Sequence, residues 1–246
     1  MTPLNHDRIR QYYDEEYYAG NRSQDGLDWH SRLIVSRLGD VRGKNILDVA
    51  CGSGEWLEEM RRRGACVAGV DISARALEQC RARIPDAELH HAVAENLPFE
   101  DNRFDIVSCL GSLEHFLDQQ RALREIQRVA RQSAKVLILV PNAGFLTRTI
   151  GLYRGTQQTA VKEDVKSIRE WETLLHAAGF DVAAQWRDLR MCSRRWIWRG
   201  PIAGRILRLA QASVLPFWPM SWQYQVYFLC VANKAVEPRD AQLSAC

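Results

Sequence analysis

No Cys-x-x-Cys pair occurs in this sequence, although 7 of its 246 residues are cysteines. An odd, scattered set of cysteines argues against a disulfide framework, and the missing pairs argue against a structural zinc site. Long apolar runs are also missing, since no uncharged stretch reaches the roughly 20 residues that a membrane-spanning helix needs. The first residues, Met1 to Asp7, lack the apolar core of a signal peptide. We therefore expect a cytoplasmic protein with no transmembrane segment, and we predict no metal.

The chain has little net charge, +3, but the charge is unevenly distributed. Residues 187–208 contain seven arginines and one acid, Asp188, so this segment carries +6 and the remainder carries −3. A basic segment beside an acidic remainder indicates an anionic partner, which could be a substrate, a membrane surface or a nucleic acid. The alternative is a helical hairpin whose arginines are simply solvated.

The most informative pattern is a glycine turn between a strand and a helix. An apolar run at 46–50 predicts a buried strand, Gly52 and Gly54 break it, and a helical pattern follows. A second apolar run ends in Asp71, 19 residues beyond Gly52. An acid at about this distance binds ribose hydroxyls in dinucleotide-binding βαβ units, so the pattern predicts a cofactor that contains adenosine.

Two residues argue against a dinucleotide. Leu57 stands where the third glycine of G-x-G-x-x-G would let the helix approach the strand. Asp48, at the end of the first strand, would repel a phosphate across a medium of low dielectric constant. S-adenosylmethionine has no phosphate and carries an ammonium and a sulfonium group, both of which a carboxylate favours. The electrostatics therefore select S-adenosylmethionine over NAD.

The turn resembles motif I of the class I S-adenosylmethionine-dependent methyltransferases, and further blocks of that family follow in its order. Similar blocks are Asp48–Gly54, Gly69–Ser73, Ala94–Phe99, Phe104–Val107, Leu113–His115, Ala122–Val129 and Trp171–Phe180. The ubiquinone-type and small-molecule O-methyltransferase branches are the most similar. The resemblance implies a Rossmann-like α/β fold with helices on both faces of a mostly parallel seven-stranded sheet. The implied strand order is 3-2-1-4-5-7-6, with the seventh strand antiparallel.

The pattern of apolar residues predicts the same alternation of strands and helices. Expected strands lie near 45–50, 66–71, 87–93, 104–110, 135–141, 180–187 and 223–233, and expected helix caps are Asp28, Ser73, Asp118 and Ser167. We divide the chain into an N-terminal helical lid at 1–40, a core at 41–189, an aromatic and arginine-rich insertion at 190–222, a last core strand at 223–234 and a frayed tail at 235–246.

The resemblance implies roles for individual residues around the cofactor. The turn that contains Asp48, Ala50, Gly52 and Gly54 would hold it. Asp71 would bind the ribose hydroxyls, unless it merely caps the next helix, and Ile72 would pack on the adenine. Val93 stands where relatives often place an acid, which leaves Ala94 or Glu95 to recognise the adenine edge; otherwise Glu95 is a solvated loop acid. Leu110 would face the methionine part. Tyr12 and Tyr17 are the expected lid residues, although the tyrosines could simply pack their helix.

The expected reaction is methyl transfer to a hydroxyl group of a small or lipid-linked acceptor, such as a sugar, polyketide or quinone. His115 is the candidate general base, with a structural histidine as the alternative. Arg148, Arg154, residues 155–158 and Glu163 are placed to line the acceptor pocket, and residues 190–222 could cover that pocket or contact a membrane peripherally. An RNA methyltransferase is disfavoured because no RNA-binding module is visible. A non-catalytic binding module is disfavoured by the intact turn, and an NAD oxidoreductase by Leu57.

Overall fold

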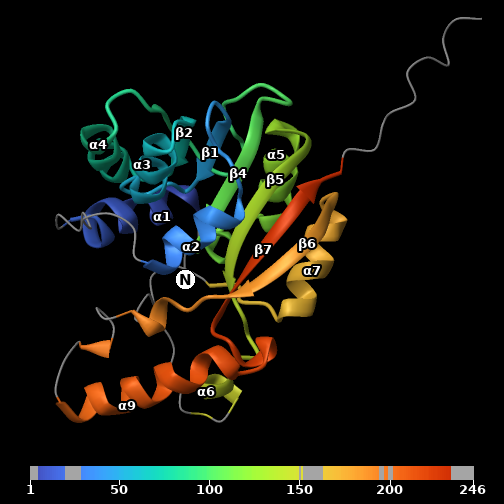
Figure 1. Cartoon of the computed structure of the whole chain (residues 1–246). Helices are drawn as coiled ribbons and strands as arrows, with labels where there is room; N and C mark the ends of the chain where they lie inside the picture. The colour runs from blue at the N-terminus through green and yellow to red at the C-terminus, as the bar shows by residue number, and fades with distance from the viewer. Residues whose placement is uncertain are drawn as a thin grey trace, which may run out of the picture.

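The fold is built on one seven-stranded sheet (Figure 1). The computed structural model describes residues 5–19, 29–149, 151, 163–193, 197–198 and 202–233. Along the sheet the strands run in the order β3-β2-β1-β4-β5-β7-β6, as the family resemblance implied. Their bounds are β1 Asn45–Val49, β2 Cys66–Asp71, β3 Glu88–His91, β4 Phe104–Leu110, β5 Ala130–Pro141, β6 Phe180–Arg187 and β7 Gln225–Ala232.

Strands β1 to β5 are parallel, whereas β7 pairs antiparallel with both β5 and β6. The predicted antiparallel seventh strand is therefore confirmed. The sheet order reverses next to β1, because β2 lies on one side of it and β4 on the other. In sheets of this kind ligands bind beyond the carboxyl ends of the strands at such a switch point.

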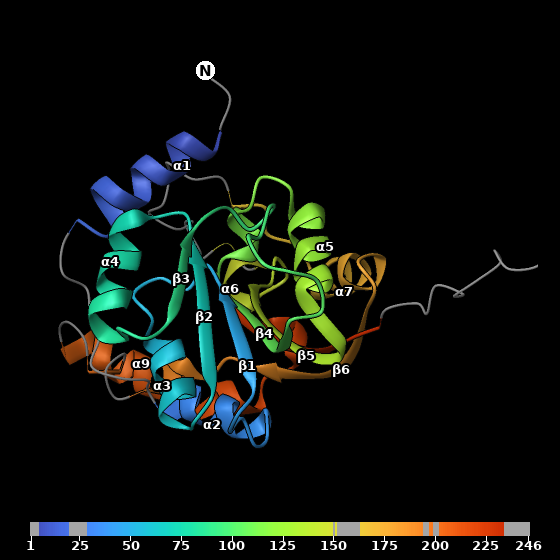
Figure 2. The same cartoon turned by 90° about the horizontal axis from the view of Figure 1, so that it is seen from above.

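Helices cover both faces of the sheet (Figure 2). One face is covered by α2 (Trp29–Arg37), α3 (Glu55–Arg62) and α4 (Ala74–Arg83), and the other by α5 (Gln119–Val129) and α7 (Ile168–Ala177). Successive strand residues point to opposite faces. In β5, for example, Val136 and Ile138 belong to the core under α5 and α7, whereas Leu137 and Leu139 pack in the core with α2 and α3.

Side-chain caps fix the starts of α4, α5 and α7. Ser73 accepts a hydrogen bond from the backbone N–H of Ala76 and begins α4, and Asp118 begins α5 in the same way. Ser167 begins α7 with a capping box completed by Glu170. These three predicted caps are confirmed, and the fourth, Asp28, lies outside the described residues.

Strand β5 begins earlier than predicted, at Ala130 rather than at 135. Helix α5 passes directly into the strand, and the pairing register with β4 then shifts between Phe104 and Ile106. Ser133 has a positive φ of 61° within the irregular stretch. Ala130 pairs with Phe104 and is buried, as is Ala134, while the residues between them are exposed.

The predicted lid at 1–40 consists of two parts with different roles. Helix α2 is part of the core, since Ile34, Val35 and Leu38 are buried in the cluster with the sheet. Only α1 (His6–Tyr12) and the π-helical turn η1 (Tyr13–Tyr17) lie over the candidate site described below. Asp14 anchors this segment by accepting a 2.6 Å hydrogen bond from the Ser73 hydroxyl at the start of α4.

The predicted insertion contains helix α9 (Ile202–Val214), followed by the short turns η4 (Leu215–Phe217) and η5 (Met220–Trp222). In Figure 1, α9 lies below the sheet, at the edge where the parallel strands end, together with the short helix α6 (Leu146–Thr149). Arg154, residues 155–158 and the predicted frayed tail at 235–246 lie outside the described residues.

Candidate active site

A cavity opens at the carboxyl ends of β1 and β2, beneath α1 and η1. It encloses about 610 Å³, a volume that includes open solvent. Six of the predicted site residues line it: Ala50, Asp71, Ile72, Ala94, Glu95 and His115. These residues come from segments that are widely separated in the sequence, and the switch point of the sheet brings them together.

Asp71 connects the two segments that form the floor of the cavity. One carboxylate oxygen accepts a 2.8 Å hydrogen bond from the backbone N–H of Gly52. The other accepts a 2.8 Å hydrogen bond from the backbone N–H of Ser73. Burial raises the pKa of Asp71 to about 6, although these two hydrogen bonds oppose the shift. Because the Ser73 side chain caps α4, Asp71 is not merely a helix cap.

Asp48 is a second buried carboxylate, in β1 and two residues before Ala50. It accepts a 2.6 Å hydrogen bond from the hydroxyl of Ser108 on the neighbouring β4. Burial is the main cause that raises its pKa to about 7, and the charge of Asp71 adds to the shift. A cation placed near this carboxylate would favour its ionised form.

Backbone geometry explains the glycines of the turn. Gly54 has a φ of +83°, and a Cβ at this position would lie 2.4 Å from the Cys80 sulfur of α4. Gly52 has a φ of +55°, and a Cβ there would lie 2.8 Å from the hydroxyl oxygen of Tyr18. The turn therefore needs glycine both for its left-handed backbone and for close packing.

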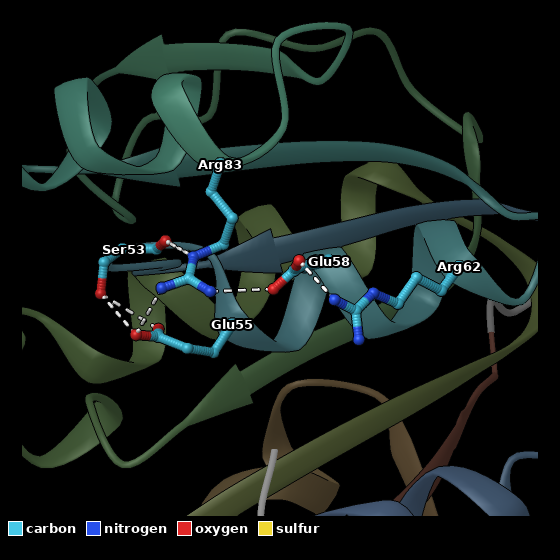
Figure 3. Close-up of polar contacts among 5 residues, drawn as sticks. All are labelled: Ser53, Glu55, Glu58, Arg62 and Arg83. Atoms are coloured by element: carbon cyan, nitrogen blue, oxygen red, sulfur yellow. Dashed lines mark hydrogen bonds and ion pairs between the residues drawn. The ribbon is translucent and has the colours of Figure 1, made fainter. Parts of the chain in front are cut away.

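An arginine from the end of α4 holds the same turn (Figure 3). The Nε of Arg83 donates a 3.0 Å hydrogen bond to the carbonyl oxygen of Ser53, and its terminal nitrogens pair with Glu55 and Glu58 of α3. The Ser53 hydroxyl in turn donates to Glu55 at 2.9 Å. This network was not predicted, because its members lie about 30 positions apart with no sequence motif.

The adenine end of the predicted site contains Ala94 and Glu95. One oxygen of Glu95 accepts hydrogen bonds from the backbone N–H groups of Leu117, at 2.9 Å, and Asp118, at 3.2 Å. Its other oxygen lies 3.4 Å from the His6 ring nitrogen Nε2. Glu95 is only 5% exposed, so the alternative interpretation as a solvated loop acid is wrong.

The tyrosines that line the cavity are Tyr13 and Tyr18. The lid residues predicted from the sequence were Tyr12 and Tyr17, which do not line it. The Tyr17 ring packs edge-on against both lining tyrosines, with ring centroids 5.4 Å from Tyr13 and 4.9 Å from Tyr18. Burial raises the pKa of Tyr13 and of Tyr18, so both stay as neutral phenols. The π-helical turn changes the spacing along the helix, which a regular helical pattern cannot predict.

Leu110, at the end of β4, is half-buried and packs against the cluster that contains α2. It is not among the residues that line the cavity, so its predicted place beside the methionine part stays a prediction. The next residue, Gly111, has a φ of +73° and begins the segment that leads to His115.

His115 lies in the short turn η2 (Leu113–His115), between two cavities. A second cavity is lined by residues 114–120, Asp164, Lys166 and Leu174, and it shares His115, Phe116 and Leu117 with the first. Glu114 is a site residue that the sequence analysis missed. It is 5% exposed, burial raises its pKa to about 7, and its Oε1 lies 3.9 Å from the Nε2 of His115. The pair Glu-His was visible in the sequence, but the burial of Glu114 was not.

Comparison with known proteins identifies the family. The methyltransferase domain family matches residues 47–138. A ubiquinone biosynthesis O-methyltransferase from Alkalilimnicola ehrlichii is 30% identical over 180 residues, which are 70% of this chain and 71% of that protein. The chain is a class I S-adenosylmethionine-dependent methyltransferase.

A second relative of this methyltransferase has a similar name. A demethylmenaquinone methyltransferase from Thermotoga maritima is 31% identical over 137 residues, and this match covers 54% of the chain and 58% of that protein. The chain thus spans less than two thirds of this relative. Both relatives are quinone methyltransferases by name.

Solved structures support the fold. The phosphoethanolamine N-methyltransferase 2 of Haemonchus contortus, in complex with S-adenosyl-L-methionine, superposes with a TM-score of 0.65 and 18% identity. The match covers 95% of this methyltransferase and 61% of that chain. The YcgJ protein of Bacillus subtilis superposes with a TM-score of 0.58 and 18% identity over 84% of this chain and 99% of that one.

The cofactor of this methyltransferase is S-adenosylmethionine, and the residues of the cavity suit it. A buried carboxylate, Asp71, stands at the glycine turn, where a ribose needs acceptors for its hydroxyl groups. The walls beside it include Ile72, Ala94 and Phe116, which suit a flat apolar base. Among the described residues, no group of three or more His, Cys, Asp or Glu side chains is placed to hold a metal ion.

Proposed function

We propose that this methyltransferase transfers a methyl group from S-adenosylmethionine to a hydroxyl group of a quinone-like acceptor that is small or lipid-linked. The names of the relatives favour a quinone-like ring, since both a ubiquinone and a menaquinone enzyme are similar to the chain. We place the reaction in the cytoplasm. This agrees with the buried thiols of Cys51, Cys80, Cys109 and Cys230, which are all free.

In this proposal Asp71 binds the ribose hydroxyls, and Ile72 and Ala94 contact the adenine. Asp48 favours the positive charge of the methionine part, while Gly52 and Gly54 let the backbone approach it. Tyr13 and Tyr18 close the cavity from above and exclude water. Glu95 keeps the adenine end in shape, because its carboxylate holds the backbone of Leu117 and Asp118.

One observation carries the assignment of the reaction centre, namely the position of His115 between the two cavities. If the first cavity holds the methyl donor, the second is the natural place for the acceptor. A base at their boundary can reach the hydroxyl group that is methylated. Glu163 directly precedes Asp164, which lines the second cavity, and its charge adds to the effect of burial on the pKa of Glu114. Its predicted place near the acceptor agrees with this arrangement.

When held by the glycine turn and Asp71, S-adenosylmethionine would supply an electrophilic methyl group to the acceptor oxygen, and S-adenosylhomocysteine would be the leaving group. His115 accepts the proton that the hydroxyl group loses. Glu114 then stabilises the protonated imidazole, and alignment of the two substrates supplies much of the rate enhancement.

The proposal is tested in two stages with the full chain. Calorimetry with S-adenosylhomocysteine and with NADH should give binding for the first ligand only. Release of S-adenosylhomocysteine from S-adenosylmethionine is then measured with a prenylated catechol and with its fully O-methylated analogue, which has no hydroxyl group. Turnover with the catechol alone supports hydroxyl methylation. Turnover with the analogue as well, or with neither compound, contradicts it. Binding to RNA at low salt would instead favour the nucleic acid alternative.

A further inference from the structure

Exposed apolar side chains are concentrated at one place in this protein. Within the described ranges, all but two of the exposed large apolar side chains lie between positions 198 and 222. They are Trp198, Ile202, Ile206, Leu209, Val214, Phe217 and Trp222, and the two elsewhere are Leu33 and Leu117. A concentration of exposed apolar side chains marks a surface that interacts with another protein or with a membrane.

Helix α9 presents three of these side chains on one face. Ile202, Ile206 and Leu209 are spaced by four and three residues, which places them in one row along the helix. They are 72%, 66% and 55% exposed. Burial of an isoleucine or leucine side chain is favourable, so this row forgoes a substantial stabilisation in the isolated chain.

The segment is held firmly by polar side chains that are themselves buried. Gln223 is fully buried and donates to the carbonyl oxygens of Leu215, at 3.0 Å, and Trp218, at 3.3 Å. Asn142, directly after β5, donates to the carbonyl oxygens of Ser221 and Gln223. The segment after α9 is therefore fixed to the sheet edge at which the parallel strands end.

The charge of the sequence segment that contains α9 favours one kind of partner. Residues 187–208 carry +6 in total, and Arg205 and Arg208 lie on α9 itself. A second copy of this chain would bring equal positive charges together, which opposes association. An anionic bilayer attracts them, and the aromatic side chains of Trp198, Phe217 and Trp222 suit the boundary between head groups and acyl chains.

We propose that Trp198, Ile202, Ile206, Leu209, Phe217 and Trp222, here called the α9 face, dock on the surface of a bilayer that contains anionic lipid. The helix lies in the plane of the surface and does not cross it; among the described residues, no helix has the length and apolarity to span a bilayer. The docked protein turns the cofactor edge of the sheet toward the lipid. A lipid-linked acceptor then reaches the second cavity from the bilayer. This delivery of the acceptor rests on the proposed function.

The test is co-sedimentation of the full chain with vesicles of phosphatidylcholine, with or without phosphatidylglycerol. The wild-type chain should bind the anionic vesicles, and the triple variant Ile202→Ser/Ile206→Ser/Leu209→Ser should lose about tenfold or more in affinity. Leu33→Ser is the matched control, because Leu33 is a 41% exposed apolar residue on α2, and its binding should be unchanged.

Two further measurements separate the possible outcomes. Calorimetry with S-adenosylhomocysteine should give the same affinity for both variants and the wild type. If the wild type binds this ligand but ignores anionic vesicles, the membrane inference is overturned and the proposed function stands. If the wild type binds vesicles but not the ligand, the proposed function is overturned and binding to the membrane stands. A wild-type dimer in light scattering that the triple variant dissociates would overturn the inference in favour of a second copy.

Discussion

The Nε of Arg83 donates a 3.0 Å hydrogen bond to the carbonyl oxygen of Ser53. It thereby connects the last turn of α4 to the glycine turn that follows β1. Neither Ser53 nor Arg83 is among the residues that line the cavity, whereas Ala50, three residues before Ser53 on the same segment, is. Arg83 is therefore a positioning residue, which fixes the shape of the turn from behind.

Removal of this contact should weaken cofactor binding. We expect Arg83→Met to raise the Kd for S-adenosylhomocysteine about tenfold, since the turn loses its hydrogen bond and Glu55 loses its counter-charge. Calorimetry measures this change. Arg62→Met is the matched control, because Arg62 is 59% exposed and pairs with Glu58 but not with the glycine turn (Figure 3). Equal Kd values for the two variants would contradict a positioning role for Arg83.

Asp71 should be required for ligand binding. Asp71→Ala removes the carboxylate that we assign to the ribose, and it also frees the N–H groups of Gly52 and Ser73. We expect S-adenosylhomocysteine to raise the melting temperature of the wild-type chain and to leave that of Asp71→Ala unchanged. Asp86→Ala, at an exposed acid that pairs with Arg61, should keep the full stabilisation. A normal thermal shift in Asp71→Ala would rule out the ribose role.

Binding of the cationic donor should release a proton. The pKa of Asp48 is raised to about 7 in the free protein, and a nearby sulfonium or ammonium group favours the ionised carboxylate and lowers this pKa. The affinity for S-adenosylmethionine should therefore increase as the pH rises toward about 7 and then level off. Calorimetry at pH 6.5 in buffers with different ionisation enthalpies measures the released proton. Asp48→Asn should show no release, and the same release in this variant would assign the proton to another group.

His115 and Glu114 should affect turnover without affecting ligand binding. We expect His115→Ala to keep its affinity for S-adenosylhomocysteine and to lose about 10²- to 10⁴-fold in kcat, the usual range for a general base. Unchanged turnover would show that the base assignment is wrong. Glu114 has a pKa raised to about 7, and only its ionised form stabilises a protonated His115. Turnover of the wild type should thus rise with pH through 7, and Glu114→Gln should flatten this rise in the pH profile of kcat.

Gly54 should tolerate no side chain. An alanine there combines a φ of +83° with a Cβ 2.4 Å from the Cys80 sulfur, and we expect a loss of about 2–4 kcal/mol in the free energy of unfolding. Gly111→Ala is the control for backbone strain alone, since φ is +73° but nothing lies within 4 Å of the added Cβ. It should lose about 1–2 kcal/mol. Urea denaturation compares the two, and equal losses would show that packing against Cys80 contributes nothing.

The sequence by itself determined the fold and the cofactor. The central strands carry buried apolar residues on both faces, and α4 and α5 begin at Ser73 and Asp118, whose side chains cap them locally. These signals act over a few residues, so they can be found without the fold. The spacing from Gly52 to Asp71 covers the turn, the helix and the second strand of one βαβ unit, whose regular geometry brings the two residues together.

Only the tertiary structure decided which side chains are buried and which meet across the sheet edge. It placed Tyr13 and Tyr18 on the cavity because a π-helical turn shifts the register, and it buried Glu114 in a short turn. It paired Arg83 with Ser53 and exposed the apolar row of α9, which a helical pattern alone would assign to a core. Burial and pairing across long sequence distances depend on where the other elements pack, and no local pattern encodes that arrangement.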